Sequence, residues 1–176
     1  MSNYFIISLP RCGTAWLANA MTWGDSYCYH EGLYGFDRMI DFSAMLSANP
    51  AKHVGDSDTT LALVLPWLYR MFPAAKYVFI HRNTEDVISS LNKAGFPTHI
   101  IPEIERSIKW GISNINGFHI SFDKVFTETR RIWDYIGLGD YPQERFEMLR
   151  HMKIDDSERF LTGQPVNLAN LMKEVA

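Results

Sequence analysis

Short runs of apolar, aromatic and β-branched residues alternate with longer segments of helical pattern along most of the chain, and this alternation constrains the fold more than any other feature. The runs that predict strands cover residues 4–8, 26–30, 53–55, 76–81 and 118–122. Helices are predicted over residues 13–21, 37–47, 59–71, 84–94, 103–116, 124–136 and 145–152. This pattern predicts an α/β fold, a three-layer sandwich in which helices cover both faces of a mostly parallel central sheet.

Turn and cap residues refine several of these boundaries. Pro66 should kink the third helix or set its real start, because a proline inside a helix lacks the N–H that the helix needs. Thr84 is predicted as the N-cap of the next helix, and Gly95 as the residue that stops it. Gly137 should end the helix over residues 124–136 in the same way.

Size and composition exclude several classes of protein. A chain of 176 residues is expected to form a single domain, residues 1–176. A net charge of −3 and a pI near 6.0 argue against a nucleic-acid binder. The two cysteines are too few for a disulfide framework and are typical of reduced thiols in a cytoplasmic protein. We expect no signal peptide, no membrane span and no metal site, since apolar runs are short and histidines lack ligand spacing.

The loop between the first predicted strand and helix has the features of an anion site. Ligands of parallel α/β sheets bind beyond the carboxyl ends of the strands, here at residues 9–14, 30–32, 55–59 and 81–84. Within residues 9–16, Gly13 permits close approach to the backbone N–H groups that open the helix, Arg11 adds a planar charged donor, and Thr14 a hydroxyl. The alternative is a turn whose arginine is only solvated. The loop lacks the G-x-x-x-x-G-K-[ST] pattern of magnesium–ATP enzymes.

Cys12 stands beside Arg11 at the predicted helix start, where a thiol can be activated. A phosphatase-like nucleophile would also need an arginine to close the loop, and Ala18 stands six residues on from Cys12 instead. We therefore expect Cys12 to be part of the loop and not a nucleophile.

A second anion site is predicted after the strongest strand. Arg82 leaves that strand at the ligand edge, and Ser90, eight residues later, lies about two turns into the next helix. An arginine and a hydroxyl placed in this way can bind one phosphate. In the alternative interpretation, Arg82 pairs with Asp86 and Ser90 packs as a small residue.

Together the two segments resemble the sulfotransferase family over roughly residues 4–150. The family's first loop, Pro-Lys/Arg-Ser-Gly-Thr-Thr-Trp, binds the 5′-phosphosulfate of 3′-phosphoadenosine 5′-phosphosulfate (PAPS). Its second motif, an arginine followed eight residues later by a serine, binds the 3′-phosphate. Matches to the two motifs are Arg11, Gly13, Thr14, Trp16, Arg82 and Ser90, while Cys12 and Ala15 replace the usual serine and threonine. Looser similarities are residues 122–125 and 131–138.

The resemblance implies a P-loop-containing, sulfotransferase-like α/β fold with PAPS as co-substrate and no metal. It implies that Trp16 packs against the adenine, although a helix aromatic can equally face the core, and that Phe122 reaches the adenine too. Two family features are missing. Residues 55–58 read Gly-Asp-Ser-Asp where many cytosolic members have Lys-x-His, and no Arg-Lys-Gly follows Arg150.

Several residues are candidates for the general base. Glu31 is favoured because it follows a strand at the ligand edge and because some bacterial and heparan-type sulfotransferases use a glutamate after the first loop. His30, Asp56 and Asp58 are alternatives, and both aspartates could instead cap the helix that follows. Arg11 is expected to stabilise the charge that develops on the leaving phosphate.

These features predict transfer of a sulfuryl group from PAPS to a hydroxyl or amine of a small-molecule or glycan acceptor. One alternative is a nucleotide or small-molecule kinase with a degenerate P-loop, although Thr14 occupies the place of its lysine. Another is a nucleotide-binding relative without catalytic activity, which the missing Lys-x-His favours.

Overall fold

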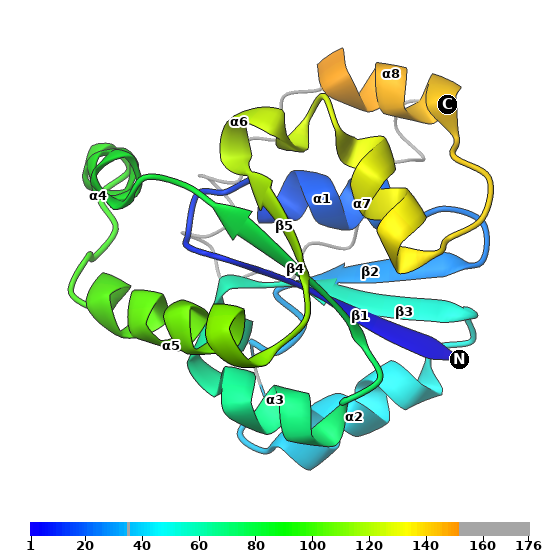
Figure 1. Cartoon of the computed structure of the whole chain (residues 1–176), viewed down its shortest axis with the longest axis horizontal. Helices are drawn as coiled ribbons and strands as arrows, with labels where there is room; N and C mark the ends of the chain where they lie inside the picture. The colour runs from blue at the N-terminus through cyan, green and yellow to red at the C-terminus, as the bar shows by residue number, and fades with distance from the viewer. Residues whose placement is uncertain (35, 152–176) are drawn as a thin grey trace.

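The computed structural model describes residues 1–34 and 36–151 and contains a central sheet of five strands. Figure 1 shows the sheet running through the middle of the molecule, and its strand order is β2-β3-β1-β4-β5. Every pair of neighbouring strands is parallel. The strands are β1 (Ser2–Ser8), β2 (Ser26–His30), β3 (His53–Ser57), β4 (Lys76–His81) and β5 (Phe118–Ser121). The predicted α/β class with a parallel sheet is confirmed.

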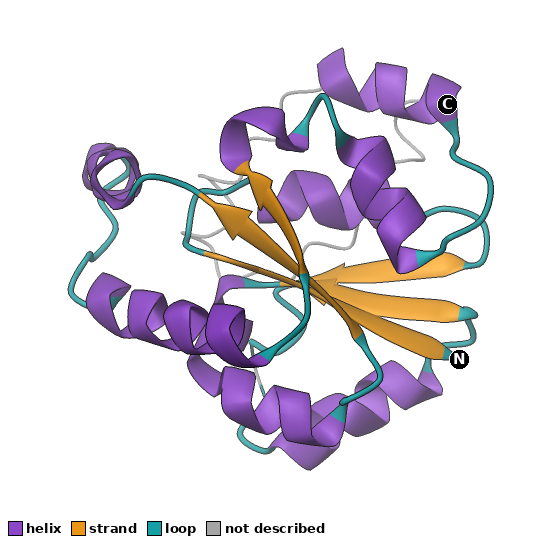
Figure 2. Ribbon diagram, viewed as in Figure 1, coloured by secondary structure: helices purple, strands orange, loops and turns teal. Residues whose placement is uncertain are grey.

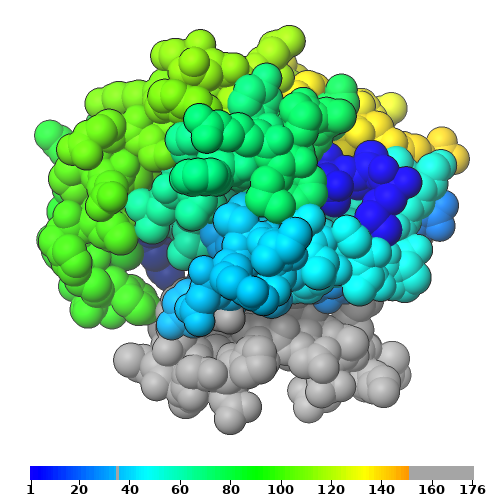
Figure 3. Space-filling view, turned by 90° about the horizontal axis from the view of Figure 1, so that it is seen from below, coloured from blue at the N-terminus to red at the C-terminus, as the bar shows by residue number. Residues whose placement is uncertain are grey.

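Helices cover both faces of the sheet, which gives three layers (Figure 2). Helices α1 (Thr14–Met21), α6 (Phe122–Val125), α7 (Thr129–Ile136) and α8 (Gln143–His151) lie on one face. On the other face lie α2 (Met39–Ala48), the 3₁₀ helix η1 (Thr59–Val64), α3 (Leu65–Met71) and α5 (Ile101–Asn114). Figure 3 views this second face from below, where side chains of these helices cover the sheet. Helix α4 (Thr84–Lys93) lies beyond the carboxyl end of β4.

From Tyr4 onward the middle strand β1 is buried on both faces, which explains the apolar run over residues 4–7. The ring of Phe5 packs against Phe42, Phe72 and Tyr77 on one face, at centroid distances of 6.4, 5.2 and 5.6 Å. On the opposite face the hydroxyl of Tyr4 lies 3.0 Å from Ser26 Oγ. Because neighbouring β1, β3 and β4 are all parallel, the loops that follow them open at one edge of the sheet.

Gly55 in β3, within the segment that stands in place of Lys-x-His, packs tightly against Tyr4. A Cβ atom on Gly55 would lie 2.2 Å from Cε2 of Tyr4, far inside contact distance. Tyr4 is fully buried and its hydroxyl also lies 3.3 Å from the carbonyl of Met21, so the ring cannot move aside without breaking buried hydrogen bonds. A side chain such as lysine therefore has no room at this position.

Several predicted boundaries differ from the structure by one or two residues, and three differences concern a cap, a helix break and the end of a strand. Thr84 is not the N-cap of α4, because Asn83 has the extended backbone that a cap requires and its Oδ1 accepts N–H groups of Glu85 and Asp86 at 2.8 and 3.3 Å. The predicted helix over residues 124–136 is two helices, α6 and α7, with Thr129 Oγ1 donating to the Val125 carbonyl at the joint. The strand predicted to end at Phe122 ends at Ser121, and Phe122 begins α6.

Other local predictions are confirmed. The segment 59–71 is a 3₁₀ helix followed by α3, with Pro66 in the first turn of α3, so the proline does set the start of the α-helix. Gly95 has φ 74° and follows the end of α4, and Gly137 has φ 84° and caps α7. The last predicted helix is α8, although Met152 lies outside the described residues. No helix among the described residues is long and apolar enough to cross a membrane.

Candidate functional site

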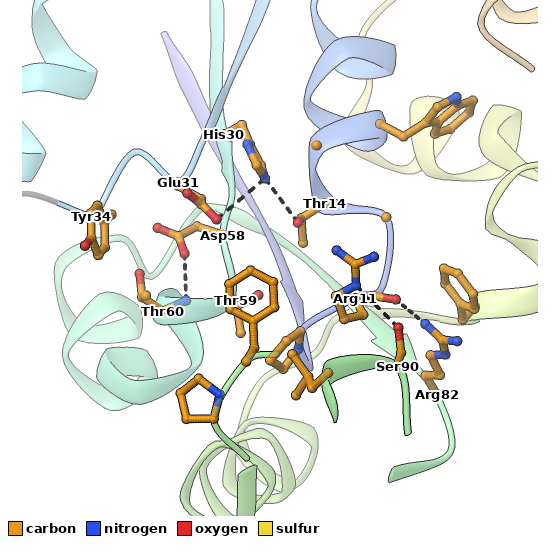
Figure 4. Close-up of a pocket in the computed structure, with 18 of the residues that line it drawn as sticks. Arg11, Thr14, His30, Glu31, Tyr34, Asp58, Thr59, Thr60, Arg82 and Ser90 are labelled. Carbon is orange, nitrogen blue, oxygen red and sulfur yellow. Dashed lines mark hydrogen bonds and ion pairs between the residues drawn. The ribbon is translucent and has the colours of Figure 1, made fainter. Parts of the chain in front are cut away.

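One pocket of about 590 Å³ opens at the carboxyl edge of the sheet (Figure 4). Each of the four loops predicted to form the ligand edge contributes to its wall. The first loop contributes Arg11 and Thr14, the end of β2 contributes Glu31, the segment after β3 contributes Thr59, and the end of β4 contributes Arg82. The four loops that the sequence places at the ligand edge therefore line one cavity.

The first loop turns sharply before α1 begins. Arg11 and Gly13 both have positive φ, 62° and 75°. The left-handed region is unusual for a residue with a side chain, so the conformation of Arg11 is held by its surroundings. A Cβ on Gly13 would lie 3.3 Å from Cζ of Phe126, which leaves little space for any other residue. Helix α1 starts at Thr14, so its free N–H groups open onto the pocket wall that Gly13 and Thr14 form.

The two predicted anion motifs meet at one end of the pocket, although Arg82 and Ser90 follow Arg11 by 71 and 79 residues in sequence. Arg11 Nε donates to Ser90 Oγ at 3.4 Å, and Arg82 Nη1 donates to the carbonyl oxygen of Arg11. Within the described residues Arg82 makes no ion pair with Asp86, the alternative that the sequence left open. The guanidinium of Arg82 lies 4.3 Å from the ring centroid of Phe122, a cation–π contact.

An aromatic wall extends from this cationic end. Phe122, Phe126, Ala15 and Trp16 line the pocket. Trp16 is only 6% exposed, its ring packs edge-on against Phe126 at 4.9 Å, and its Nε1 donates to the carbonyl of Leu149 at 3.0 Å. Trp16 is thus part of the hydrophobic core and also lines the cavity.

Cys12 is turned away from the pocket. Its thiol is fully buried, its Sγ lies 3.6 Å from the Pro10 carbonyl, and burial raises its pKa to about 12. Of Cys12, only the backbone could therefore contact a ligand bound at the first loop. The positive charge of Arg82 acts to lower the pKa of Cys12, but burial outweighs it, so the thiol is not activated.

The two free cysteines should accordingly resist alkylation. At pH 8, only about 10⁻⁴ of Cys12 is thiolate if its pKa is about 12, against roughly a quarter of an exposed cysteine. Cys28 is buried as well and its pKa is also raised by burial. Labelling by iodoacetamide, followed by mass spectrometry, should be about 10³-fold slower in native protein than in urea. Rapid labelling of either cysteine in the native protein would contradict the buried environment of the two thiols.

His30 and Glu31 lie opposite the cationic end. His30 Nε2 lies 3.2 Å from Thr14 Oγ1 and 4.0 Å from Glu31 Oε1. Burial lowers the pKa of His30 to about 4, so the imidazole is neutral near pH 7. The Glu31 side chain is about one third exposed, at 32%, and forms part of the pocket wall. Two candidate bases, Glu31 and Asp58, are carboxylates on the pocket wall, and Glu31 is much the more exposed, because Asp58 is only 1% exposed.

The two aspartates after β3 are placed differently from each other. Asp58 lines the pocket and caps η1, because its Oδ1 accepts the N–H of Thr60 at 2.7 Å. Asp56 is fully buried and does not line the pocket. Burial foremost, and then the charge of Asp58, raise its pKa. The position of Asp56 does not suit direct proton transfer from an acceptor.

Sequence reasoning missed several parts of the wall. Thr60 lies on the side near Glu31. Leu91, Phe96 and Pro97 come from α4 and the loop after it. Phe126 was also missed, although it stands one helical turn after Phe122 and its spacing could have revealed an aromatic pair. Within the described residues no group of three or more His, Cys, Asp or Glu side chains could hold a metal ion.

The parallel five-stranded sheet with helices on both faces defines an α/β protein of sulfotransferase-like fold. The structure is similar to the crystal structure of mouse sulfotransferase SULT7A1 complexed with PAP, with a TM-score of 0.57 and 13% sequence identity. The match covers 85% of this chain and 64% of that chain, so this chain spans less than two thirds of its length. No protein-family model and no curated protein matches the sequence.

Proposed function

We propose that this protein is a PAPS-dependent sulfotransferase that transfers a sulfuryl group to a hydroxyl or amine of a small-molecule or glycan acceptor. The observation that carries the proposal is the meeting of Arg11, Arg82 and Ser90 at one end of a pocket that has Glu31 on its wall. One end of the cavity thus offers cationic donors for phosphates, and another wall offers a carboxylate.

The residues of the cationic end suit a nucleotide that carries two separate phosphate groups. The positive φ of Gly13 and the start of α1 leave backbone N–H groups for the 5′-phosphosulfate, and Arg11 adds a charged donor. Arg82 and Ser90 would hold the 3′-phosphate. Trp16 and Phe122 offer ring surface for an adenine.

Each chemical task of the reaction then falls to a residue of the pocket. PAPS, when bound, supplies an activated sulfuryl group whose leaving group is a phosphate. Arg11 and the N–H groups at the start of α1 stabilise the negative charge on that phosphate. Glu31 accepts the proton of the acceptor hydroxyl or amine. Neutral His30 orients Thr14 through their 3.2 Å contact and links the two sides of the pocket.

Ligand-dependent thermal stability tests this proposal before any acceptor is known. A ligand at 100 times its dissociation constant stabilises the folded state by about 2.7 kcal/mol. For a domain of this size, that should raise Tm by about 5–10 °C. We expect 3′,5′-ADP (PAP) to give such a shift with or without EDTA, and 5′-AMP to give a smaller one.

Other outcomes would favour the alternative functions. Stabilisation by magnesium–ATP with no effect of 3′,5′-ADP would contradict the proposal and favour a kinase. A shift with 3′,5′-ADP, but no transfer of radiolabelled sulfate from PAPS to any compound of a broad panel of alcohols, phenols, amines and glycans, would favour a non-catalytic nucleotide-binding relative.

A further inference from the structure

The backbone that carries Glu31 has an unusual conformation. Glu31 directly follows β2 and has φ 56°, in the left-handed region that residues with side chains seldom adopt. Such a residue persists only where the surrounding structure holds it in place. The turn that begins at Glu31 is closed by the N–H of Tyr34, which donates to the Glu31 carbonyl at 3.2 Å.

The side chain of Asp56 accepts hydrogen bonds from the backbone of this turn. Tyr29 of β2 and Asp56 of β3 are partners in the sheet, so the chain beyond β2 passes next to the aspartate. The N–H of Gly32 donates to Asp56 Oδ1 and the N–H of Leu33 donates to Asp56 Oδ2, both at 3.1 Å. Asp58 Oδ2 accepts from Leu33 as well, at 3.2 Å.

The contact between Asp56 and the turn leaves no space for a side chain at Gly32. A Cβ at residue 32 would lie 2.8 Å from Cβ of Tyr29 and 3.0 Å from Oδ2 of Asp56. Glycine therefore allows the backbone to come close enough for both carboxylate oxygens to be used. A fully buried carboxylate is costly unless hydrogen-bonded, so the turn and the aspartate stabilise each other.

We propose that Asp56 is a positioning residue, which holds the Glu31–Tyr34 turn through Gly32 and Leu33 so that the Glu31 carboxylate faces the pocket. Figure 4 shows Glu31 and Tyr34 on the same side of the cavity as Asp58, opposite Arg82 and Ser90. Asp56 then acts on the reaction only through Glu31, without touching either substrate. The catalytic part of this inference rests on the proposed sulfotransferase function.

Amide hydrogen exchange in Asp56→Asn tests the contact directly. Asparagine keeps one oxygen acceptor but places an NH₂ group against the second backbone N–H, so both hydrogen bonds cannot form. We expect exchange at Gly32 to be at least about tenfold faster than in wild type, and exchange at Leu33 to change less, because the Leu33 N–H also donates to Asp58 Oδ2. The matched control is Ser57→Ala, which changes a buried neighbour in β3 that makes no side-chain hydrogen bond with the turn in the described structure. Unchanged exchange in Asp56→Asn would overturn the proposal.

A double-mutant cycle tests the catalytic part. Asp56→Asn should lower kcat about tenfold or more, while the affinity for 3′,5′-ADP stays within about twofold. In a Glu31→Gln background the same change should have almost no further effect, because Asp56 acts through Glu31. Fully additive losses, or loss of 3′,5′-ADP binding, would overturn the positioning role.

A second variant covers the case in which Asp56→Asn does not fold. Gly32→Ala pushes on the same turn from the opposite side and should also accelerate exchange at Leu33 and lower kcat. Wild-type exchange and kcat in Gly32→Ala would contradict the proposal. Amide hydrogen exchange needs no substrate, so it tests the hydrogen bonds between Asp56 and the turn even if the protein proves not to transfer sulfate. Failure of the proposed function would appear separately, as the absence of a 3′,5′-ADP thermal shift.

Discussion

Glu31→Gln is expected to reduce turnover by about 10²–10⁴-fold, the usual cost of losing a general base, with donor affinity near wild type. Glutamine has nearly the same shape and can still form hydrogen bonds, but it cannot accept the proton of an acceptor hydroxyl. Single-turnover sulfate transfer to a compound found in the acceptor screen measures the effect on chemistry. Calorimetry with 3′,5′-ADP measures donor affinity.

Two further variants give this experiment its controls. Glu85→Gln removes the same charge from the exposed first turn of α4 and should leave turnover unchanged. Asp58→Asn should destabilise η1, because Asp58 caps it, and should lower turnover far less than Glu31→Gln. Full activity in Glu31→Gln together with collapse in Asp58→Asn would instead assign the base to the segment after β3.

The position of the pocket could be predicted from the sequence because it follows from topology. In a parallel sheet the loops after successive strands open at the same edge, so Arg11 and Arg82 had to approach one another once both were placed at strand ends. Their actual contacts could not be predicted. Whether Ser90 meets Arg82 or Arg11 depends on the orientation of α4 beyond β4, which no local pattern encodes.

The different positions of Asp56 and Asp58 also escaped sequence analysis. The two side chains stand two residues apart and look equally suitable for capping or catalysis. Only the return of the turn after β2 over β3 makes Asp56 an acceptor for Gly32 and Leu33. The cap of α4 was missed for a similar reason, because Asn83 and Thr84 are both good N-cap residues and the choice depends on the backbone angles of Asn83.

The second large effect is expected in the double variant Arg82→Ala, Ser90→Ala. A hydrogen bond to a charged group contributes about 1.5–3 kcal/mol, so loss of two such bonds to a 3′-phosphate should weaken 3′,5′-ADP by roughly 10²–10⁴-fold. Affinity for 5′-AMP should fall only a few-fold. Some loss of 5′-AMP affinity is expected, because Arg82 also donates a hydrogen bond to the carbonyl of Arg11 and so stabilises the first loop.

Titration calorimetry with both nucleotides separates a specific phosphate site from general electrostatic attraction. The matched control is Lys93→Ala, which removes one positive charge from the exposed end of the same helix and should alter neither affinity by more than about twofold. Ser90→Ala alone should retain most 5′-AMP affinity, since Arg82 then still holds Arg11. Equal losses for 3′,5′-ADP and 5′-AMP in the double variant would mean that Arg82 and Ser90 only support the first loop. The 3′-phosphate would then have to be bound elsewhere in the pocket, and the eight-residue spacing would lose its functional meaning.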